Sequence, residues 1–243
     1  MAKPRKAFLT AEWRYLVMFN YRIDPESLGA HVPAGTELDR WGGHAYVSLV
    51  GFHFRKTRIL ALPVPLHDTF EEVNLRFYVR RIAGGEVRHG VTFIKEIVPL
   101  PAVAATARLT YNEPYETRQM QHRIDKHSET SPTEVEYSWK ENRGWGKLGI
   151  TTTESSHYPD SGSLEEFLAI RHWGYTRQRD GSTTEYHVEH PDWQIFPEVS
   201  HVLKGNFVEL YGEKFARVLD DEPASVFLAD GSGVSVSAPH KLR

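Results

Sequence analysis

The chain has 243 residues, of which 40% are hydrophobic, with 29 basic and 32 acidic side chains and a formal net charge of −3. This size and composition predict one domain over residues 1–243 with a sizeable core, and the charge balance argues against nucleic-acid binding, which needs a basic surface. The absence of cysteine excludes disulfides, thiol nucleophiles and thiolate metal sites. The first residues lack the apolar stretch of a signal peptide, and no run approaches about 18 apolar residues. We therefore expect a cytoplasmic protein with no membrane partner.

In the first quarter of the chain, the pattern predicts two strands separated by a short helix. Residues 13–21 and 45–54 are rich in aromatic and β-branched side chains, which favour strands. Between them, Asp24 suits a helix N-cap and Pro25 suits the first helical position. Two prolines in residues 60–66 then predict a loop or an edge crossing.

The most informative stretch is residues 70–79, followed by residues 89–97. Both alternate with a period of two and predict paired strands. One face of the first strand carries the polar side chains Glu72, Asn74, Arg76 and Tyr78, and the other carries Val73, Leu75, Phe77 and Val79. Such a polar face either meets water or lines a polar pocket inside a barrel.

The remainder of the chain predicts more strands and two helices. Residues 102–109 are rich in alanine, which favours a helix. Residues 122–152 predict strands separated by polar turns. Ser163 and Glu166 form a capping box at the start of a helix over 163–172. Further strand-like segments are residues 173–178, 183–188 and 225–237. Many strands with few helices predict a mainly β (α+β) fold, either an antiparallel barrel or a sandwich.

Several motifs along the chain together resemble a known family. They are the E-x-N-x-R-x-Y pattern of Glu72 to Tyr78 and the segments 24–28, 32–33, 89–93, 107–108, 114–115, 164–171, 190–193 and 223–230. In their order along the chain, these motifs resemble the YqjF-like family, an uncharacterised group called DUF2071. The resemblance implies the acetoacetate decarboxylase-like fold, a closed antiparallel β-barrel with a central cavity and a few short peripheral helices.

The resemblance also raises the question of lysine chemistry. Acetoacetate decarboxylase forms an imine through a lysine whose pKa is lowered by its surroundings. Here the corresponding region, residues 98–103, contains no lysine pair, and the nearby Lys95 is followed by the anion Glu96. If the protein is an enzyme, we expect a lyase or decarboxylase-like activity on small keto acids. The alternative is a non-catalytic ligand-binding or structural barrel without imine chemistry.

We predict a site on the polar face of residues 70–79 and its neighbours. The candidate catalytic residues are Lys95, as a nucleophile or an electrostatic partner, and Glu72, as an acid or base. The candidate substrate-binding residues are Arg76, Asn74, Tyr78, Arg108 and Tyr115, with the Arg76 fork suited to a carboxylate.

Structural roles for the same residues remain open. Glu72 and Arg76 would then neutralise each other, and Lys95 would be a surface lysine, or an inward partner of Glu72. In a regular strand, Lys95 and Glu96 point to opposite faces, and a single bulge would reverse them.

We expect no metal and no cofactor. His187 and His190 form a His-x-x-His pair that lacks the glutamate of the zincin motif, and a proline turn follows directly. The sequence has no Gly-x-Ser-x-Gly elbow and no glycine-rich phosphate loop before a helix. The expected partner is a small organic acid or carbonyl ligand, with no nucleic acid and no membrane, while assembly into a homo-oligomer remains open.

Overall fold

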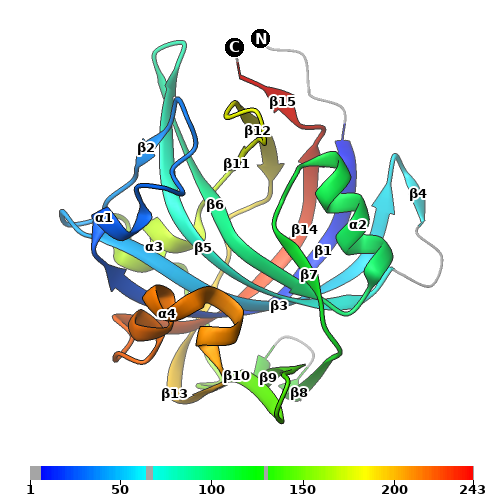
Figure 1. Cartoon of the computed structure of the whole chain (residues 1–243). Helices are drawn as coiled ribbons and strands as arrows, with labels where there is room; N and C mark the ends of the chain where they lie inside the picture. Colours follow the sequence, from blue (N-terminus) through cyan, green and yellow to red (C-terminus); the bar gives the residue numbers. More distant parts are fainter. Residues whose placement is uncertain (1–6, 64–67, 129–130, 243) are drawn as a thin grey trace.

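A closed ring of strands forms the centre of the computed structural model, which describes residues 7–63, 68–128 and 131–242. The hydrogen-bonded order is β12–β11–β6–β5–β3–β1–β14, and pairing of β14 with β12 closes the ring (Figure 1). Neighbouring strands of the ring are antiparallel, except that β6 and β11 pair in parallel. The ring strands are β1 (Ala7–Ile23), β3 (Ala45–Ile59), β5 (Phe70–Ala83), β6 (Glu86–Val98), β11 (Trp173–Arg177), β12 (Thr183–Glu189) and β14 (Ser225–Ser237). This architecture confirms the predicted mainly β fold with a closed sheet.

A second group of strands continues from β14 and packs against the outside of the ring, at the bottom of Figure 1. Its order is β13 (Ile195–Lys204), β10 (Trp145–Thr152), β9 (Ser131–Lys140) and β8 (Met120–Ser128). The two layers are in close contact at Gly51 of β3, where an added Cβ would come within 2.8 Å of the Tyr137 ring. Short strands add to the edges: β2 (Glu37–Leu38), β4 (Leu62–Pro63), β7 (Tyr115–Thr117) and β15 (His240–Lys241).

The helices are peripheral. They are α1 (Pro25–Leu28), α2 (Pro101–Thr110), α3 (Leu164–Ala169) and α4 (Phe207–Leu219). The expected starts of α1 and α3 are confirmed, because Asp24 accepts a hydrogen bond from the Glu26 amide and Ser163 accepts one from the Glu166 amide. The helix after Ser163 ends at Ala169, however, which is earlier than the pattern predicted. In the described part of the chain, no helix is long and apolar enough to cross a membrane.

Strand β5 is buried on both faces, and its alternation is as predicted. Val73, Leu75, Phe77 and Val79 belong to the apolar core between the ring and the second layer, which also contains Tyr137, Trp139 and Leu148, and Phe207 and Leu210 of α4. On the opposite face, Glu72, Asn74 and Arg76 line a cavity. The polar face of β5 therefore points into the ring and away from bulk water.

A β-bulge in β6 decides which of its residues share that cavity. Arg76 of β5 pairs with Phe93, but Leu75 pairs with Lys95, so Ile94 is an extra residue on β6. Before the bulge, Val91 and Phe93 line the cavity, and after it the lining residue is Glu96. Regular alternation from Phe93 would have brought Lys95 inward, and the bulge brings Glu96 inward in its place.

Candidate functional site

A cavity of about 200 Å³ lies on the inner face of the ring. Its volume is several times the share of one liquid water, about 30 Å³, so it has room for a small organic molecule. One wall is aromatic: Trp13 packs edge-on against Phe52 with ring centroids 5.5 Å apart, and Phe54 stacks on Phe70 at 4.5 Å. Helix α2 contributes small apolar and hydroxyl side chains to the lining, which are Ala102, Val103, Thr106 and Ala107. In Figure 1, α2 lies in front of β1 and β14, whose residues line the same cavity.

The polar end of the cavity contains three buried carboxyl groups. Glu72, Glu96 and Glu113 are 2%, 1% and 7% exposed. Glu72 accepts hydrogen bonds from the Asn74 amide at 2.9 Å and from the Tyr115 hydroxyl at 2.8 Å. Glu113 accepts hydrogen bonds from the hydroxyls of Tyr186 and, at 3.4 Å, Thr176. In the part of the chain that the structure describes, Glu96 Oε2 is buried and has no hydrogen-bond partner.

The turn after α2 brings Glu113 and Tyr115 to this end. Asn112 adopts a left-handed backbone conformation (φ 58°), which asparagine tolerates better than most residues. The chain then runs beside β6, where the Glu96 amide donates to the Pro114 carbonyl and Tyr115 of β7 pairs with Glu96. A single tight turn thus places the Glu113 carboxyl and the Tyr115 phenol next to a third acidic side chain.

Burial controls the protonation of the three carboxyls. Loss of hydration raises the pKa of Glu72 and of Glu113 to about 7, and it raises the pKa of Glu96 well above the usual value. The neighbouring carboxyls add to the rise at Glu96 and Glu113, whereas the hydrogen bonds from Asn74 and Tyr115 and the charge of Arg76 oppose the rise at Glu72. The cluster therefore holds protons at neutral pH and exchanges them as a coupled group.

Arg76 is the positive counterpart on the cavity wall. It is 8% exposed, and one terminal nitrogen donates to the Leu168 carbonyl at 3.3 Å. Its Nε has no hydrogen-bond partner within the described residues, and neither has Oδ1 of Asn74 on the same strand face. The hydrogen bonds of Glu72 come from Asn74 and Tyr115, which leaves part of the Arg76 guanidinium available to a ligand.

The structure brings four of the predicted residues together, since Glu72, Asn74, Arg76 and Tyr115 all line the cavity. Tyr78 lies on the same face of β5 but does not line the cavity, and its hydroxyl forms a hydrogen bond with the Ser48 hydroxyl. Arg108 does not line the cavity either, and its Nε donates to the Ala104 carbonyl within α2.

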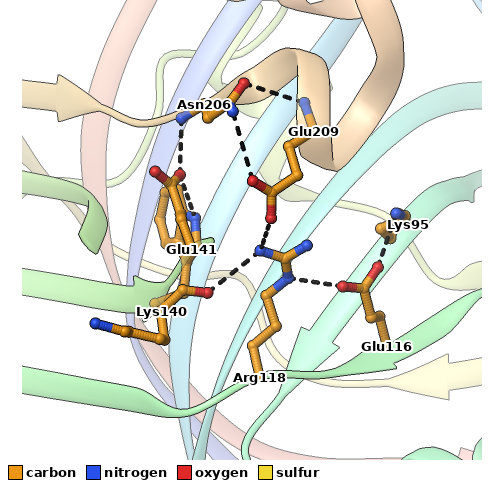
Figure 2. A network of polar contacts seen from close by, with 8 residues as sticks. Lys95, Glu116, Arg118, Lys140, Glu141, Asn206 and Glu209 are labelled. Carbon is orange, nitrogen blue, oxygen red and sulfur yellow. Dashed lines mark hydrogen bonds and ion pairs between the residues drawn. The ribbon is translucent and has the colours of Figure 1, made fainter. Parts of the chain in front are cut away.

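Lys95 lies on the opposite side of β6 from the cavity. Its Nζ is 2.8 Å from Glu116, which also binds Arg118, and Arg118 in turn binds Glu209 at the start of α4 (Figure 2). Of the alternatives for Lys95, the inward pair with Glu72 does not form, and the lysine takes part instead in a network that links β6 and β7 to α4. None of the described residues that line the cavity is a lysine.

Sequence reasoning did not assign the remaining polar lining residues to the site. Glu96 stood out only as a neighbour of Lys95, and Glu113 lies in a turn without a periodic signal. Tyr186 lies in the predicted strand-like segment 183–188, but nothing in that segment singled it out. Arg171, also in the lining, pairs with Asp39 at 2.9 Å. His190 lines the cavity too and stacks on Trp193 at 4.2 Å. Among the described residues, no group of three His, Cys, Asp or Glu side chains is arranged to hold a metal ion.

Known proteins resemble this chain in sequence and in fold. A model of the family DUF2071, described as an uncharacterized conserved protein, matches residues 10–233. The chain is 37% identical to the uncharacterized protein YqjF of Bacillus subtilis (strain 168) over 68 residues, and this match spans only 28% of either protein.

Solved structures share the fold along nearly the whole chain. Acetoacetate decarboxylase from Legionella pneumophila matches with a TM-score of 0.68 at 12% identity, over 100% of this chain and 90% of its own. An acetoacetate decarboxylase-like enzyme from Sphingomonas wittichii RW1 gives 0.66 at 16% identity, over 98% and 94%. The enduracididine biosynthesis enzyme MppR, complexed with pyruvate, gives 0.65 at 11% identity, over 100% and 92%. These likenesses confirm the acetoacetate decarboxylase-like fold.

The raised pKa of Glu113 predicts a pH-dependent stability. The folded protein holds a proton on Glu113 up to about pH 7, whereas the unfolded chain releases it near the ordinary value of 4.5, so this group makes stability fall as pH rises between these values. We expect Glu113→Gln, which keeps an acceptor for Tyr186, to raise the melting temperature relative to wild type at about pH 8 more than at about pH 4. Thermal unfolding across this range measures the difference. The matched control is Glu86→Gln at an exposed position, and parallel curves for wild type and Glu113→Gln would contradict the assignment.

The position of Lys95 predicts the outcome of imine trapping. Borohydride reduction in the presence of pyruvate or acetoacetate should leave Lys95 unmodified, because its amine pairs with Glu116 outside the cavity. Intact mass followed by peptide mapping measures this, with an active acetoacetate decarboxylase as positive control. A stable adduct on Lys95 would contradict this placement of its amine.

Proposed function

The chain belongs to the DUF2071 family and has the acetoacetate decarboxylase-like fold, and from this premise we propose that its cavity binds a small organic acid or carbonyl compound. The ligand carries a carboxylate or carbonyl at one end and an apolar group at the other. It is held without a covalent bond to lysine.

The available guanidinium of Arg76 is the observation that carries this proposal. A buried guanidinium with an unpartnered N–H group is costly, and arginine stays protonated at all physiological pH values. A ligand carboxylate would offset that cost by accepting two parallel hydrogen bonds from the guanidinium fork.

The rest of the lining sets the size and character of the ligand. The aromatic wall around Trp13 and Phe54 favours an apolar or aromatic group. A small molecule with one polar end therefore matches the cavity better than a sugar or a nucleotide. The pyruvate bound to MppR, an enzyme of the same fold, supports a small acid as ligand.

Substitution of Arg76 tests the binding proposal. We expect wild type to bind 3-phenylpropionate in isothermal titration calorimetry and Arg76→Gln to bind it at least about tenfold more weakly, because a hydrogen-bonded charge contributes about 1.5–3 kcal/mol. Arg76→Lys keeps the charge without the fork and should fall between the two.

The matched control for this experiment is Arg108→Gln, which removes a guanidinium outside the lining and should bind like wild type. Melting temperatures would establish that all variants fold. Equal affinity of Arg76→Gln and wild type, or no carboxylate binding by wild type, would refute the proposal and favour a structural barrel.

A second candidate function is proton transfer to or from the bound ligand. Glu72 favours it, because its pKa of about 7 lies where a general base or acid works best and its oxygens face the cavity beside Tyr115. In this role the Glu72 carboxylate removes a proton next to the ligand carbonyl, and the oxygen of the resulting enolate lies against Arg76. Return of the proton to carbon regenerates both partners.

Hydrogen exchange of pyruvate separates binding from proton transfer. If Glu72 acts as a base, the protein should speed exchange of the pyruvate methyl protons with deuterium oxide, with a rate that rises with pH through about 7 because the ionised form is the base. Glu72→Gln should abolish this exchange yet retain 3-phenylpropionate binding. Proton NMR measures the rate. Exchange no faster than in buffer would leave a binding protein without this catalytic activity.

A further inference from the structure

Two buried oxygen atoms at the acidic end of the cavity accept no hydrogen bond from the described residues. They are Oε2 of Glu96 and Oδ1 of Asn74, and these two residues are 1% and 2% exposed. The two residues face each other across β5 and β6 as a register pair. The hydroxyl protons nearby are in use, since Tyr115 donates to Glu72 and Tyr186 donates to Glu113.

The ligand group that complements such a surface is a donor with positive charge. An ammonium group has three donor hydrogens and no acceptor, so it satisfies Glu96, Asn74 and a further carboxyl at once. The carboxyl groups of the cluster avoid repelling one another by holding protons. The positive charge of an ammonium group would balance the ionised carboxylates in place of those protons. A neutral hydroxyl offers one donor only and leaves one of the two acceptors without a partner.

We propose that Glu96 and Asn74 form a subsite for the primary ammonium group of the ligand, which makes the ligand an amino acid with an apolar side chain. The inference rests on the proposed function, because it concerns the same cavity. Arg76 and Asn74 are two residues apart on one strand face, about 7 Å along the strand, so a carboxylate on Arg76 and an ammonium beside Asn74 fit one small molecule.

Proton release is a signature that distinguishes this subsite from simple burial of an amine. The free cluster holds protons at neutral pH, and an arriving ammonium favours the ionised carboxylates. Binding of the cation should therefore release protons to the buffer. Binding of a carboxylate alone should not release them from this cluster.

The test compares two ligands that differ by one group, phenylalanine and 3-phenylpropionate. Calorimetry at about pH 7 in phosphate and in Tris, whose ionisation enthalpies differ, gives both affinity and proton release. We expect one enantiomer of phenylalanine to bind at least about tenfold more tightly than 3-phenylpropionate and to release protons. Glu96→Gln should remove this preference and the release while 3-phenylpropionate binding is retained, and Glu86→Gln should change neither.

Each outcome decides between the two proposals. If 3-phenylpropionate binds but phenylalanine binds no more tightly, the ammonium subsite is wrong and the acid-binding proposal stands. If phenylalanine binds more tightly but Glu96→Gln keeps the preference, the subsite is elsewhere and this assignment fails. If neither ligand binds, titration with 2-phenylethylammonium separates the claims, because its binding with proton release supports the subsite and its failure to bind removes both.

Discussion

Burial of strand β5 on both faces is the constraint on which the rest of this structure depends. One face contributes Val73, Leu75 and Phe77 to the core beneath the second layer of strands, so the opposite face must point into the ring. A slip of one residue would move Glu72 and Arg76 into the apolar core, where unpaired charges are costly. Packing on the outside of the ring therefore fixes the polar composition of the inside, and the site is a consequence of the fold.

The bulge at Ile94 then determines the chemistry of that interior. Because one extra residue reverses the alternation of β6, a carboxyl group stands opposite Asn74 and the lysine amine stands outside. The displaced Lys95 takes part in an ion-pair network with Glu116, which also engages Arg118. The chain shares its fold with acetoacetate decarboxylase, and among the described residues the polar lining of its cavity includes acids and arginines and no lysine.

The sequence predicted the parts of the molecule that local periodicity determines. The two faces of β5, the start of α3 at Ser163 and the alanine-rich α2 follow from residue spacing alone. Strand β13 was not predicted because it is largely exposed and has no alternating apolar pattern. Helix α4 was not predicted either, although Asn206 caps it through the Glu209 amide; its apolar residues follow helical spacing, but Gly212 interrupts the helix at φ 80°. Two carboxyls of the site could not be predicted from the sequence either. A turn positions Glu113 and a bulge turns Glu96 inward, and neither feature produces a periodic pattern of residues.

The acidic and the basic side chains of the cavity differ in how they carry their charge. The carboxyl end can neutralise itself, because Glu72, Glu96 and Glu113 retain protons when nothing else balances them. Arg76 cannot neutralise itself, because a guanidinium does not lose its proton in a protein. In the binding mode that we propose, recognition of an anion at Arg76 is therefore independent of pH over the physiological range. Recognition of a cation at Glu96 would strengthen as pH rises and the cluster gives up protons more readily. The proposed site would therefore discriminate among ligands by charge, and that discrimination would depend on pH.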